Sequence, residues 1–306
     1  MAAKDARHAQ NGGWSTVLAP VVGEGFMEQG EISLSEREFS RIKARVYKVA
    51  GISLSDAKRT LVVSRLSKIV RALGLVSFDD YVDFLEKGAS SSDGQDFINA
   101  LTTNLTRFYR EDHHFDHLRT YVGALMSERP RGQRLRIWSA GCSTGQEPYT
   151  IGMDLLAAFP ELKRWDFKIL ATDIDTAVIA KAARGIYPEN ELSGLSAERA
   201  RPFQKLGDGN VQVPQAVREL ISFKPLNLIA EWPMKGPFDA IFCRNVAIYF
   251  DKPTQGAVFG RFGKLLAPEA FLYIGHSENL GSGGDGFRLV GKTIYQSKRM
   301  NKREAA

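Results

Sequence analysis

The stretch LRIWSAGCSTGQEPY, residues 135–149, decides the fold of this chain. Its apolar start predicts a buried strand, and Glu147 enters a predicted helix that runs to Ala158. Between them lie Gly141 and Gly145, and a glycine turn of this kind lets a ligand approach the backbone. The first N–H groups of the helix are free to bind that ligand. The stretch therefore predicts a ligand site at the carboxyl end of a strand in an α/β sheet.

The alternation of strand and helix continues to the end of the chain. Short apolar runs predict further strands at residues 167–171, 221–223, 238–242, 271–274 and 293–296. Amphipathic stretches at residues 176–183 and 253–266 predict two more helices between them. Such alternation is typical of a doubly wound parallel sheet. We therefore predict a Rossmann-like α/β domain over residues 116–300.

One segment, about residues 184–220, interrupts this alternation. The run Gly207-Asp208-Gly209-Asn210 lies between two short apolar stretches and consists of residues that tolerate positive φ. That composition is typical of the turn of a β-hairpin. We predict an antiparallel β insertion in a connection of the sheet; it is either a docking element or a plain structural addition.

The first third of the chain has a wholly helical pattern. Residues 1–33 are rich in Gly and Ala and lack periodicity, so we expect a flexible N-terminal tail. Ser35 and Glu38 have the spacing of a capping box at the start of a helix. Apolar residues then recur at helical spacing through about residue 103. These features predict a small all-helical N-terminal domain over residues 34–115.

The positive charge of the chain is concentrated in this helical domain. The 306 residues carry a net charge of +6, but the segment from Arg41 to Arg71 contains nine Lys or Arg and one acid, Asp56. That segment alone has a net charge of +8, so the rest of the chain is slightly acidic. A local basic patch predicts an acidic partner: nucleic acid, an anionic membrane surface or an acidic protein face. The alternative is that these residues only form two solvent-exposed helix faces and bind no partner.

Composition excludes several classes of protein. The two cysteines, Cys142 and Cys243, exclude a disulfide scaffold, and we expect a cytoplasmic protein. The sequence contains no run of about 18 apolar residues, so we expect no insertion into a membrane. His113, His114 and His117 are close in sequence, but no cluster of acids or cysteines completes a metal-ligand set. We therefore expect no metal site.

Two carboxylates indicate which ligand the glycine turn binds. Asp173 follows the second predicted strand, and an acid at that position binds the two hydroxyl groups of a ribose. Glu147 stands at the start of the helix, where it would repel a pyrophosphate and attract a cation. The turn also departs from the G-x-G-x-x-G pattern, because Gly141 and Gly145 are four residues apart. S-adenosylmethionine, with an ammonium and a sulfonium group, fits these features better than the nicotinamide dinucleotide of a dehydrogenase.

Several further motifs follow one another along the chain. They are LTTNLT at 101–106, RE at 110–111, HHF at 113–115, WSAGCSTG at 138–145, ATDIDT at 171–176, FCRNV at 242–246, IYF at 248–250 and GHSE at 275–278. With this series the chain closely resembles the CheR-type chemotaxis receptor methyltransferases. The resemblance extends from Ser35 to Ser297, and so many blocks in the right order are highly specific.

The resemblance implies an S-adenosylmethionine-dependent protein-glutamate O-methyltransferase, which converts the cofactor to S-adenosyl-L-homocysteine. It also implies a Rossmann-like methyltransferase domain with a small N-terminal all-helical domain and an antiparallel β insertion. The cofactor-binding residues that it implies are Asn104, Thr106, Arg110, Glu147, Asp173, Asn227, Leu228, Arg244 and Asn245. The residues that it places at the methyl-transfer site are Arg110, Arg244 and Tyr249.

The implied substrate needs no general base, because a glutamate carboxylate is already ionised at pH 7. The site then has to align this nucleophile and partly remove its water. We expect Arg244 or Arg110 to orient the carboxylate and the Tyr249 hydroxyl to lie near the transfer path. A nucleic-acid methyltransferase and a catalytically inactive cofactor sensor remain as alternatives.

The resemblance also implies a partner, the cytoplasmic methylation helices of chemoreceptors. These helices carry rows of glutamates, so the segment Arg41–Arg71 is the predicted docking face, and we expect no nucleic acid as partner. In the family the β insertion can hold a peptide from the receptor's tail. Here the turn from Leu206 to Asn210 is compact, and we expect independence from a C-terminal receptor pentapeptide.

Three positions depart from the family's pattern. Gln146 replaces an acid before Glu147, Tyr109 stands where Phe is common, and Ala247 replaces a larger apolar residue. The principal cofactor-binding residues are intact. We therefore expect a slight effect on cofactor affinity and none on the presence of activity.

Overall fold

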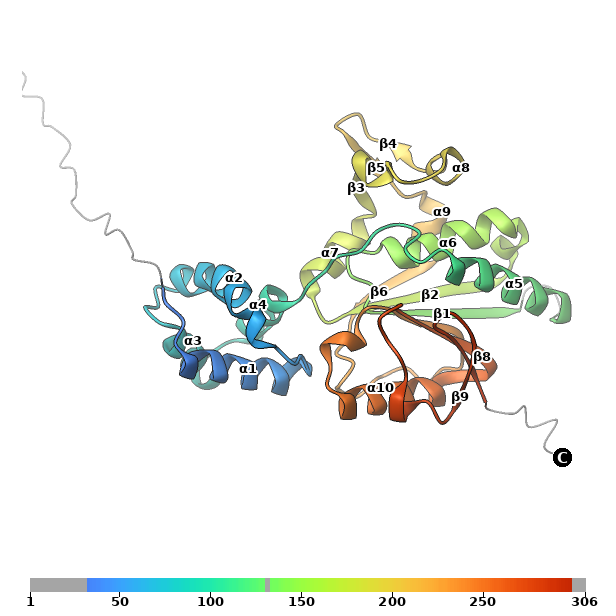
Figure 1. Ribbon diagram of the computed structural model, residues 1–306. Helices are drawn as coiled ribbons and strands as arrows, with labels where there is room; N and C mark the ends of the chain where they lie inside the picture. The colour runs from blue at the N-terminus through green and yellow to red at the C-terminus, as the bar shows by residue number, and fades with distance from the viewer. Residues whose placement is uncertain (1–31, 130–132, 299–306) are drawn as a thin grey trace, which may run out of the picture. The chain divides into compact units, whose positions relative to one another are not determined.

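The computed structural model describes residues 32–129 and 133–298 of the chain (Figure 1). The predicted flexible tail, residues 1–33, lies almost wholly outside the described residues. The predicted boundaries between the helical domain and the sheet domain stay predictions. The fold class is confirmed: an all-helical segment precedes a Rossmann-like α/β domain that carries a separate antiparallel sheet.

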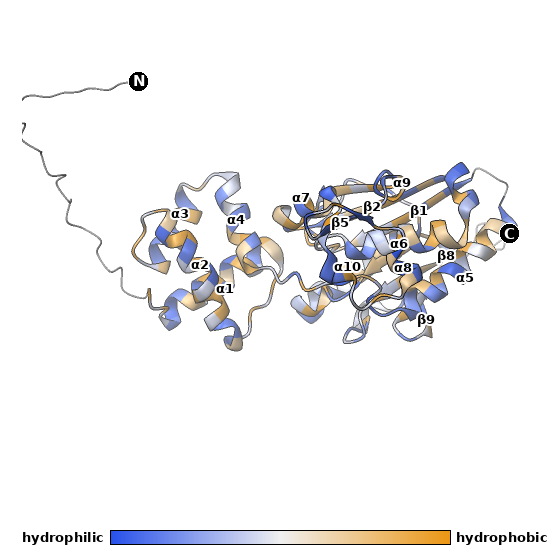
Figure 2. Ribbon diagram, turned by 90° about the horizontal axis from the view of Figure 1, so that it is seen from above, coloured by the Kyte–Doolittle hydropathy of each residue, from blue (hydrophilic) through white to orange (hydrophobic). Residues whose placement is uncertain are grey.

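Four helices open the described chain. They are α1 (Glu36–Ala50), α2 (Arg59–Ala72) with the short helix η1 (Asp56–Lys58) before it, α3 (Phe78–Lys87) and α4 (Ser91–Leu101). The predicted capping box starts α1, because the Glu38 N–H donates to the Ser35 hydroxyl and the Glu38 carboxylate accepts from the Ser35 N–H. Hydrophobic and hydrophilic residues alternate along these helices (Figure 2), and the hydrophobic ones form a core around Phe39, Leu66 and Phe78.

The main sheet has seven strands in the order β6-β2-β1-β7-β8-β10-β9. Their bounds are β1 (Arg134–Ala140), β2 (Asp166–Asp173), β6 (Ile221–Pro225), β7 (Phe238–Cys243), β8 (Leu266–Ile274), β9 (Phe287–Gly291) and β10 (Ile294–Ser297). The five neighbouring strands β6, β2, β1, β7 and β8 are parallel to one another. Strand β10 pairs antiparallel with both β8 and β9. From β1 the chain first builds outward to β2 and β6 and then returns to add β7 on the other side. Such a reversal leaves a crevice at the carboxyl ends of β1 and β7.

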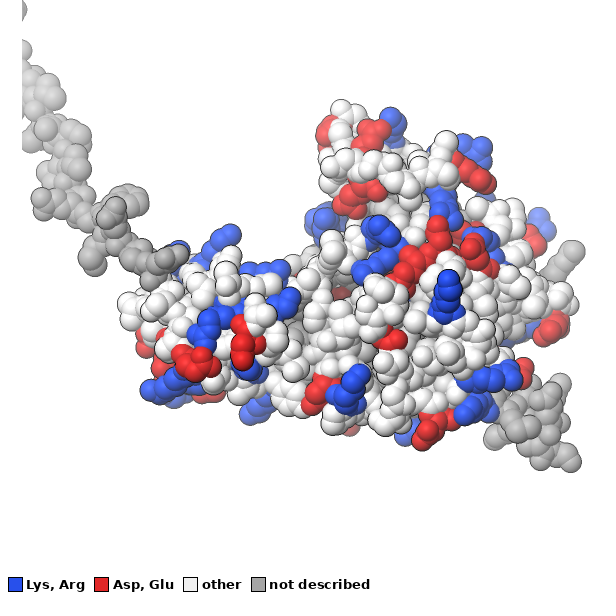
Figure 3. Space-filling view, viewed as in Figure 1, with Lys and Arg blue, Asp and Glu red and all other residues white. Residues whose placement is uncertain are grey.

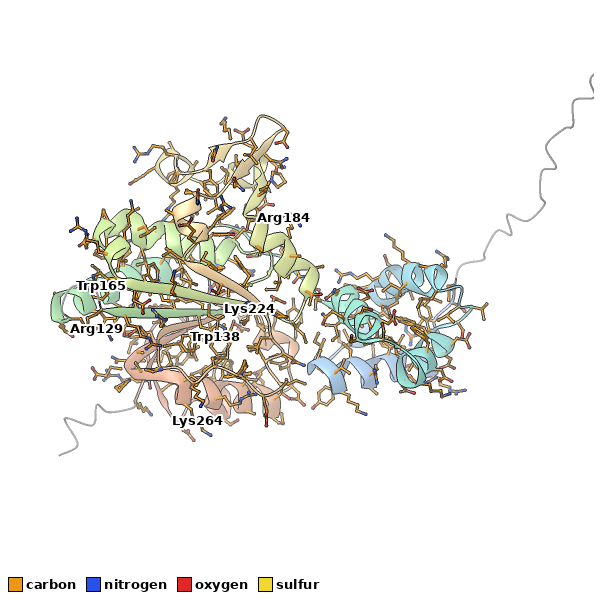
Figure 4. The ribbon with its side chains drawn as sticks, turned by 180° about the vertical axis from the view of Figure 1, so that it is seen from behind. Arg129, Trp138, Trp165, Arg184, Lys224 and Lys264 are labelled. Carbon is orange, nitrogen blue, oxygen red and sulfur yellow. The ribbon has the colours of Figure 1, made fainter. Side chains whose placement is uncertain are left out.

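Helices cover both faces of this sheet (Figure 1). They are α5 (His113–Glu128), α6 (Gln146–Ala158), η2 (Pro160–Arg164), α7 (Thr176–Arg184) and α10 (Lys252–Leu265), with the short turns η4 (Ala247–Tyr249) and η5 (Gly281–Gly283). Alternate residues of β1 enter different cores: Ile137 packs with residues of α5 and α6, whereas Trp138 packs with residues of α10. The Trp138 ring lies 5.1 Å from the ring of Phe262, in the layer between the sheet and α10 (Figure 4). The central strands of the sheet are thus buried on both faces, as a parallel sheet requires.

The predicted insertion forms a second, three-stranded antiparallel sheet in the order β3-β5-β4. Its elements are β3 (Ile186–Pro188), η3 (Glu189–Leu192), α8 (Ala197–Ala200), β4 (Gln204–Lys205), β5 (Asn210–Gln212) and α9 (Gln215–Arg218). Arg184, at the end of α7, marks where the chain enters it (Figure 4). The predicted turn joins β4 to β5, with Gly207 at φ 73° and Gly209 at φ 78°.

Strand β9 is one of the elements that sequence patterning missed, with helix α5 and strand β3 among the others. Its residues Arg288, Leu289 and Val290 are all exposed, because β9 is an edge strand that contacts the sheet only through β10. A strand exposed on both faces has no alternation of apolar and polar residues to reveal it.

Candidate active site

A cavity opens at the carboxyl ends of β1, β2 and β7, where the strand order reverses. The turn after β1 contributes Gly141 and Cys142, β2 contributes Asp173, and Arg244 follows β7. The segment 101–107, which joins α4 to the sheet domain, forms a further wall. A crevice at this place is where open α/β sheets bind their ligands.

All the residues that sequence analysis assigned to the cofactor or to methyl transfer line this cavity. They are Asn104, Thr106, Arg110, Glu147, Asp173, Asn227, Leu228, Arg244, Asn245 and Tyr249. The fold thus brings together side chains that are spread from position 104 to position 249 of the chain.

The guanidinium of Arg244 is the electrostatic centre of the cavity. Its side chain is 3% exposed, and its Nη1 lies 3.2 Å from Oε2 of Glu147 in α6. Its Nη2 lies 3.3 Å from Oε2 of Glu111 and donates to the main-chain oxygen of Arg110. The cation therefore links α6, the turn after β7 and the segment before α5. Because two carboxylates already compensate its charge, Arg244 is a poor binding group for a third carboxylate.

The titratable groups next to Arg244 are two carboxylates, Glu111 and Glu147, and one imidazole, His114. Burial and the nearby Arg244 lower the pKa of His114 to about 3, so this imidazole is neutral at pH 7. Burial acts to raise the pKa of Glu111, but Arg244 and the hydrogen bonds from His276 together outweigh it and hold that pKa below its usual value. At Glu147 burial prevails, and the pKa is raised. Two carboxylates thus flank one guanidinium, which favours a cationic ligand.

Asp173, the last residue of β2, has unused hydrogen-bond acceptor sites. Its Oδ2 accepts the N–H of Ser143 at 2.8 Å, and its Oδ1 accepts the N–H of Asp175 at 3.0 Å. Burial raises the pKa of Asp173, and these two N–H donors act in the opposite direction. Each carboxylate oxygen can accept a second hydrogen bond. Asp173 can therefore still accept two hydroxyl groups of a ligand.

Asp175 fixes the segment that covers the cavity. Its Oδ2 accepts hydrogen bonds from the Thr102 hydroxyl at 2.6 Å and from the Asn104 amide at 2.8 Å. Its Oδ1 accepts the N–H groups of Ala177 and Val178 and so caps α7. The carboxylate therefore joins the wall formed by segment 101–107 to the sheet domain.

Glu278 holds the turn after β7. It is 8% exposed, and its Oε2 accepts the N–H groups of Gly275 at 2.6 Å and Asn245 at 2.8 Å. Its Oε1 accepts the N–H groups of Val246 at 3.0 Å and Ile248 at 3.2 Å. Asn245 has φ 59°, in the left-handed region that side chains rarely adopt. The carboxylate thus stabilises the strained turn from which Arg244 enters the cavity.

Sequence analysis gave Glu111 and Glu278 no role beyond their place in motifs. A signal for Glu278 was available, because it follows the end of β8 just as Asp173 ends β2, and both strands point to the same edge. Glu111 had no comparable signal, since it precedes a helix rather than following a strand.

The three departures from the family's pattern lie outside the cavity lining. Gln146 is buried, and its amide donates to Oε2 of Glu191 in the insertion at 2.8 Å. An acid at this position would face the carboxylate of Glu191. Tyr109 and Ala247 are both buried in the sheet domain's cores.

Much of the basic segment Arg41–Arg71 is neutralised within its own domain. The guanidinium of Arg41 lies 2.8 Å from Asp79 and 2.6 Å from Asp83, both in α3. Further internal partners are Asp56 for Lys43, Glu36 for Arg59, and main-chain oxygens for Arg45 and Arg65. Basic and acidic side chains are accordingly interspersed on this domain in Figure 3. The charge of +8 belongs to the segment and not to the domain's surface.

Four basic side chains of the segment remain exposed: Lys48, Lys58, Lys68 and Arg71. Within the part of the chain that the structure describes, none of them has a partner. Lys68 and Arg71 lie on the exposed side of α2.

No helix within residues 32–129 and 133–298 is both long and apolar enough to cross a membrane. The same residues contain no group of three or more His, Cys, Asp or Glu side chains arranged to hold a metal ion. Cys142 and Cys243 are buried and free.

Two family models match the chain. The model described as CheR methyltransferase, all-alpha domain, matches residues 37–102. The model described as CheR methyltransferase, SAM binding domain, matches residues 104–296.

Proteins from several organisms are similar over most of their length. A probable chemotaxis protein methyltransferase of Rhizobium etli is 46% identical over 257 residues, which cover 82% of this chain and 96% of the relative. The chemotaxis protein methyltransferase of Escherichia coli is 44% identical over 272 residues, covering 86% and 92%. That of Borreliella burgdorferi is 40% identical over 256 residues, covering 81% and 90%.

The substitution Glu278→Gln tests the role of the carboxylate at the turn after β7. The amide keeps the shape but has one acceptor oxygen, so about two of the four N–H groups lose their partner, at about 1–3 kcal/mol for each one that is buried. We expect a lower thermal midpoint and at least a tenfold loss of affinity for S-adenosylhomocysteine, measured by calorimetric titration. The matched control Glu161→Gln, in the exposed helix η2, should change neither. Unchanged affinity in Glu278→Gln would show that the turn holds its conformation without the carboxylate.

Proposed function

The chain belongs to the CheR methyltransferase family, and we propose that it methylates specific glutamates in chemoreceptors, the methyl-accepting chemotaxis proteins. It is an S-adenosylmethionine-dependent methyltransferase. The proposed products are S-adenosylhomocysteine and a glutamyl methyl ester, and the proposed location is the cytoplasm. The observation that carries the proposal is the distribution of charge in the cavity. Buried carboxylates favour a cationic methyl donor, and arginines 107 and 110 in the same lining favour a carboxylate acceptor.

The residues present fit S-adenosylmethionine. Asp173, with two acceptor sites left, would bind the ribose hydroxyl groups. The carboxylate of Glu147, which lies next to Arg244, would attract the cationic groups of S-adenosylmethionine. The other residues assigned to the cofactor are Asn104, Thr106, Arg110, Asn227, Leu228, Arg244 and Asn245.

The cofactor supplies an electrophilic methyl group, and the protein's task is to bring a carboxylate to it. The incoming glutamate is ionised at pH 7, so no side chain has to remove a proton. Arg110 lines the cavity and is free of a strong carboxylate partner, because its Nε lies 4.0 Å from Glu111. Arg110 is therefore the proposed group that orients the carboxylate, with Tyr249 beside the transfer path. Arg244, compensated by two acids, has a positioning role.

We assign the docking of the receptor's glutamate-rich helices to the exposed cations on α2. Lys68 and Arg71 are free to pair with acids of a partner, whereas Arg65 donates to the main-chain oxygen of Ala100 and supports the fold. The interspersed acids of the helical domain favour an acidic protein over nucleic acid as the partner.

Independence from a receptor pentapeptide is part of the proposal. A peptide that binds the insertion by adding a strand needs a free strand edge. One edge strand, β4, is two residues long, and the other, β3, is three residues long. Strands this short offer few hydrogen bonds to an added peptide.

The direct test of the function is the chemistry of the transferred methyl group. The protein is incubated with methyl-labelled S-adenosylmethionine and membranes that contain chemoreceptors. We expect label in receptor protein that alkali releases as methanol, because a glutamyl ester is hydrolysed by base. Alkali-stable label, or label in RNA or DNA, would contradict the proposal.

A factorial experiment tests docking and pentapeptide independence together. The enzymes are the wild type and a Lys68→Glu, Arg71→Glu variant, and the receptors are full-length or lack their last five residues. Reversing two exposed cations should lower the methylation rate about tenfold or more on both receptors, because like charges then meet. The affinity for S-adenosylhomocysteine should stay unchanged.

Truncating the receptor should leave the wild-type rate unchanged. A loss of methylation on the truncated receptor would overturn independence, and full activity of the charge-reversed variant would overturn docking on α2. The variant Lys163→Glu, Arg164→Glu in η2 is the matched control for two charge reversals at exposed positions.

A further inference from the structure

Arg107 stands apart from the other arginines of the cavity. Arg244 is compensated by Glu111 and Glu147, and Arg110 donates from Nη1 to the main-chain oxygen of Leu105 at 3.0 Å. Arg107 is exposed, and across residues 32–129 and 133–298 no hydrogen bond, ion pair or ring contact engages its side chain. It is thus an uncompensated cation in the lining of the cavity.

The backbone that carries Arg107 is held at both ends. On one side the Asn104 amide donates to Asp175 at 2.8 Å, and the Asn104 main-chain oxygen accepts from the Ser143 hydroxyl at 3.1 Å. On the other side the Phe108 ring, 3% exposed, lies 5.0 Å from the rings of both Tyr187 and Phe203 in the insertion. The span 105–107 therefore lies between two anchored positions.

Side-chain exposure alternates along this span. All three residues of the span line the cavity, but Thr106 is half-buried, whereas Leu105 and Arg107 are exposed, Leu105 to 83%. Leu105 and Arg107 thus form a pair of exposed side chains, one apolar and one cationic, in the lining of the cavity. Leu105 places an exposed apolar side chain two residues from this cation.

We propose that Leu105 and Arg107 form a recognition strip for the segment that flanks the methylated glutamate. Arg107 pairs with a second carboxylate one helical turn from the target, and Leu105 covers an apolar side chain of the same helix. On a helix, residues three or four apart lie on the same side, about 5–6 Å between Cβ atoms. When the target enters the cavity, a second acid at that spacing comes within reach of a long arginine side chain. This inference rests on the proposed function, because it takes a receptor helix as the substrate.

A double-mutant cycle tests the pairing of Arg107 with the second acid. The enzymes are wild type and Arg107→Gln, and the receptor in the membranes is either unchanged or has the acid one turn from its mapped methylation site replaced by Gln. Arg107→Gln should lower kcat/KM about fivefold on the unchanged receptor, the upper range for an exposed ion pair, through KM rather than kcat. The altered receptor should be methylated at the same reduced kcat/KM by both enzymes.

Three further measurements separate recognition from structural damage. The control Arg164→Gln removes an exposed guanidinium in η2 and should retain wild-type kcat/KM. Helix η2 precedes β2 and therefore lies at the edge of the sheet opposite the cavity. Leu105→Ser should lower kcat/KM severalfold, whereas Leu289→Ser, at an exposed leucine of β9, should not. The affinity for S-adenosylhomocysteine should be unchanged in every variant, while co-sedimentation with receptor membranes should weaken for Arg107→Gln and Leu105→Ser alone.

The outcomes distinguish this inference from the proposed function. If the wild type transfers no methyl group to receptors, both proposals fall. If the wild type methylates receptors but the losses from Arg107→Gln and from the receptor substitution simply multiply, the proposed function stands and the recognition strip is wrong. An equal loss in Arg164→Gln would also overturn the strip, because the effect would then follow from net charge.

Discussion

The active site depends on the ion pairs of a single buried guanidinium, that of Arg244. It reaches Glu147 in α6 and Glu111 before α5, and it enters from the turn after β7. A buried charge is expensive unless it is paired, so the segments that provide the partners must stay where they are. The turn that carries Arg244 is fixed in the same way, because Glu278 accepts four of its neighbouring N–H groups. The cavity is thus shaped by charges before any ligand enters.

Two sets of charges in the cavity have different roles, one toward the methyl donor and one toward the acceptor. Around Arg244 the acids outnumber the base, which suits a donor with cationic groups. At the wall of the cavity Arg107 is uncompensated, which suits an acidic acceptor. A pocket for the methyl donor and a rim for the carboxylate acceptor can therefore lie in one cavity without competing for the same side chains.

How much of this could be read from the sequence differs from element to element. The stretch 135–149 determines the strand, the turn and the helix locally. Parallel strands end at one edge of a sheet, so Asp173 at the end of β2 and Arg244 after β7 are expected in the same cavity. The neutralisation of the basic segment could not be predicted, because the partners of Arg41 lie in another helix, α3, about 40 positions away. The ion pairs of Arg244 could not be predicted for the same reason, because its acidic partners lie in α6 and in the segment before α5. Local patterns place side chains on elements, whereas pairing across elements follows only from the packed fold.

The most direct test of this account is the pH dependence of S-adenosylmethionine binding, measured by calorimetry for the wild type and Glu147→Gln, with Glu161→Gln as the control. Burial raises the pKa of Glu147, so its negative charge is lost at a higher pH than that of an ordinary glutamate when the solution is acidified. The account predicts that wild-type affinity falls on acidification from pH 8 to pH 5. It also predicts that Glu147→Gln binds more weakly at pH 8 and loses part of this pH dependence. Equal affinities at pH 8 and parallel pH profiles in the two proteins would contradict it.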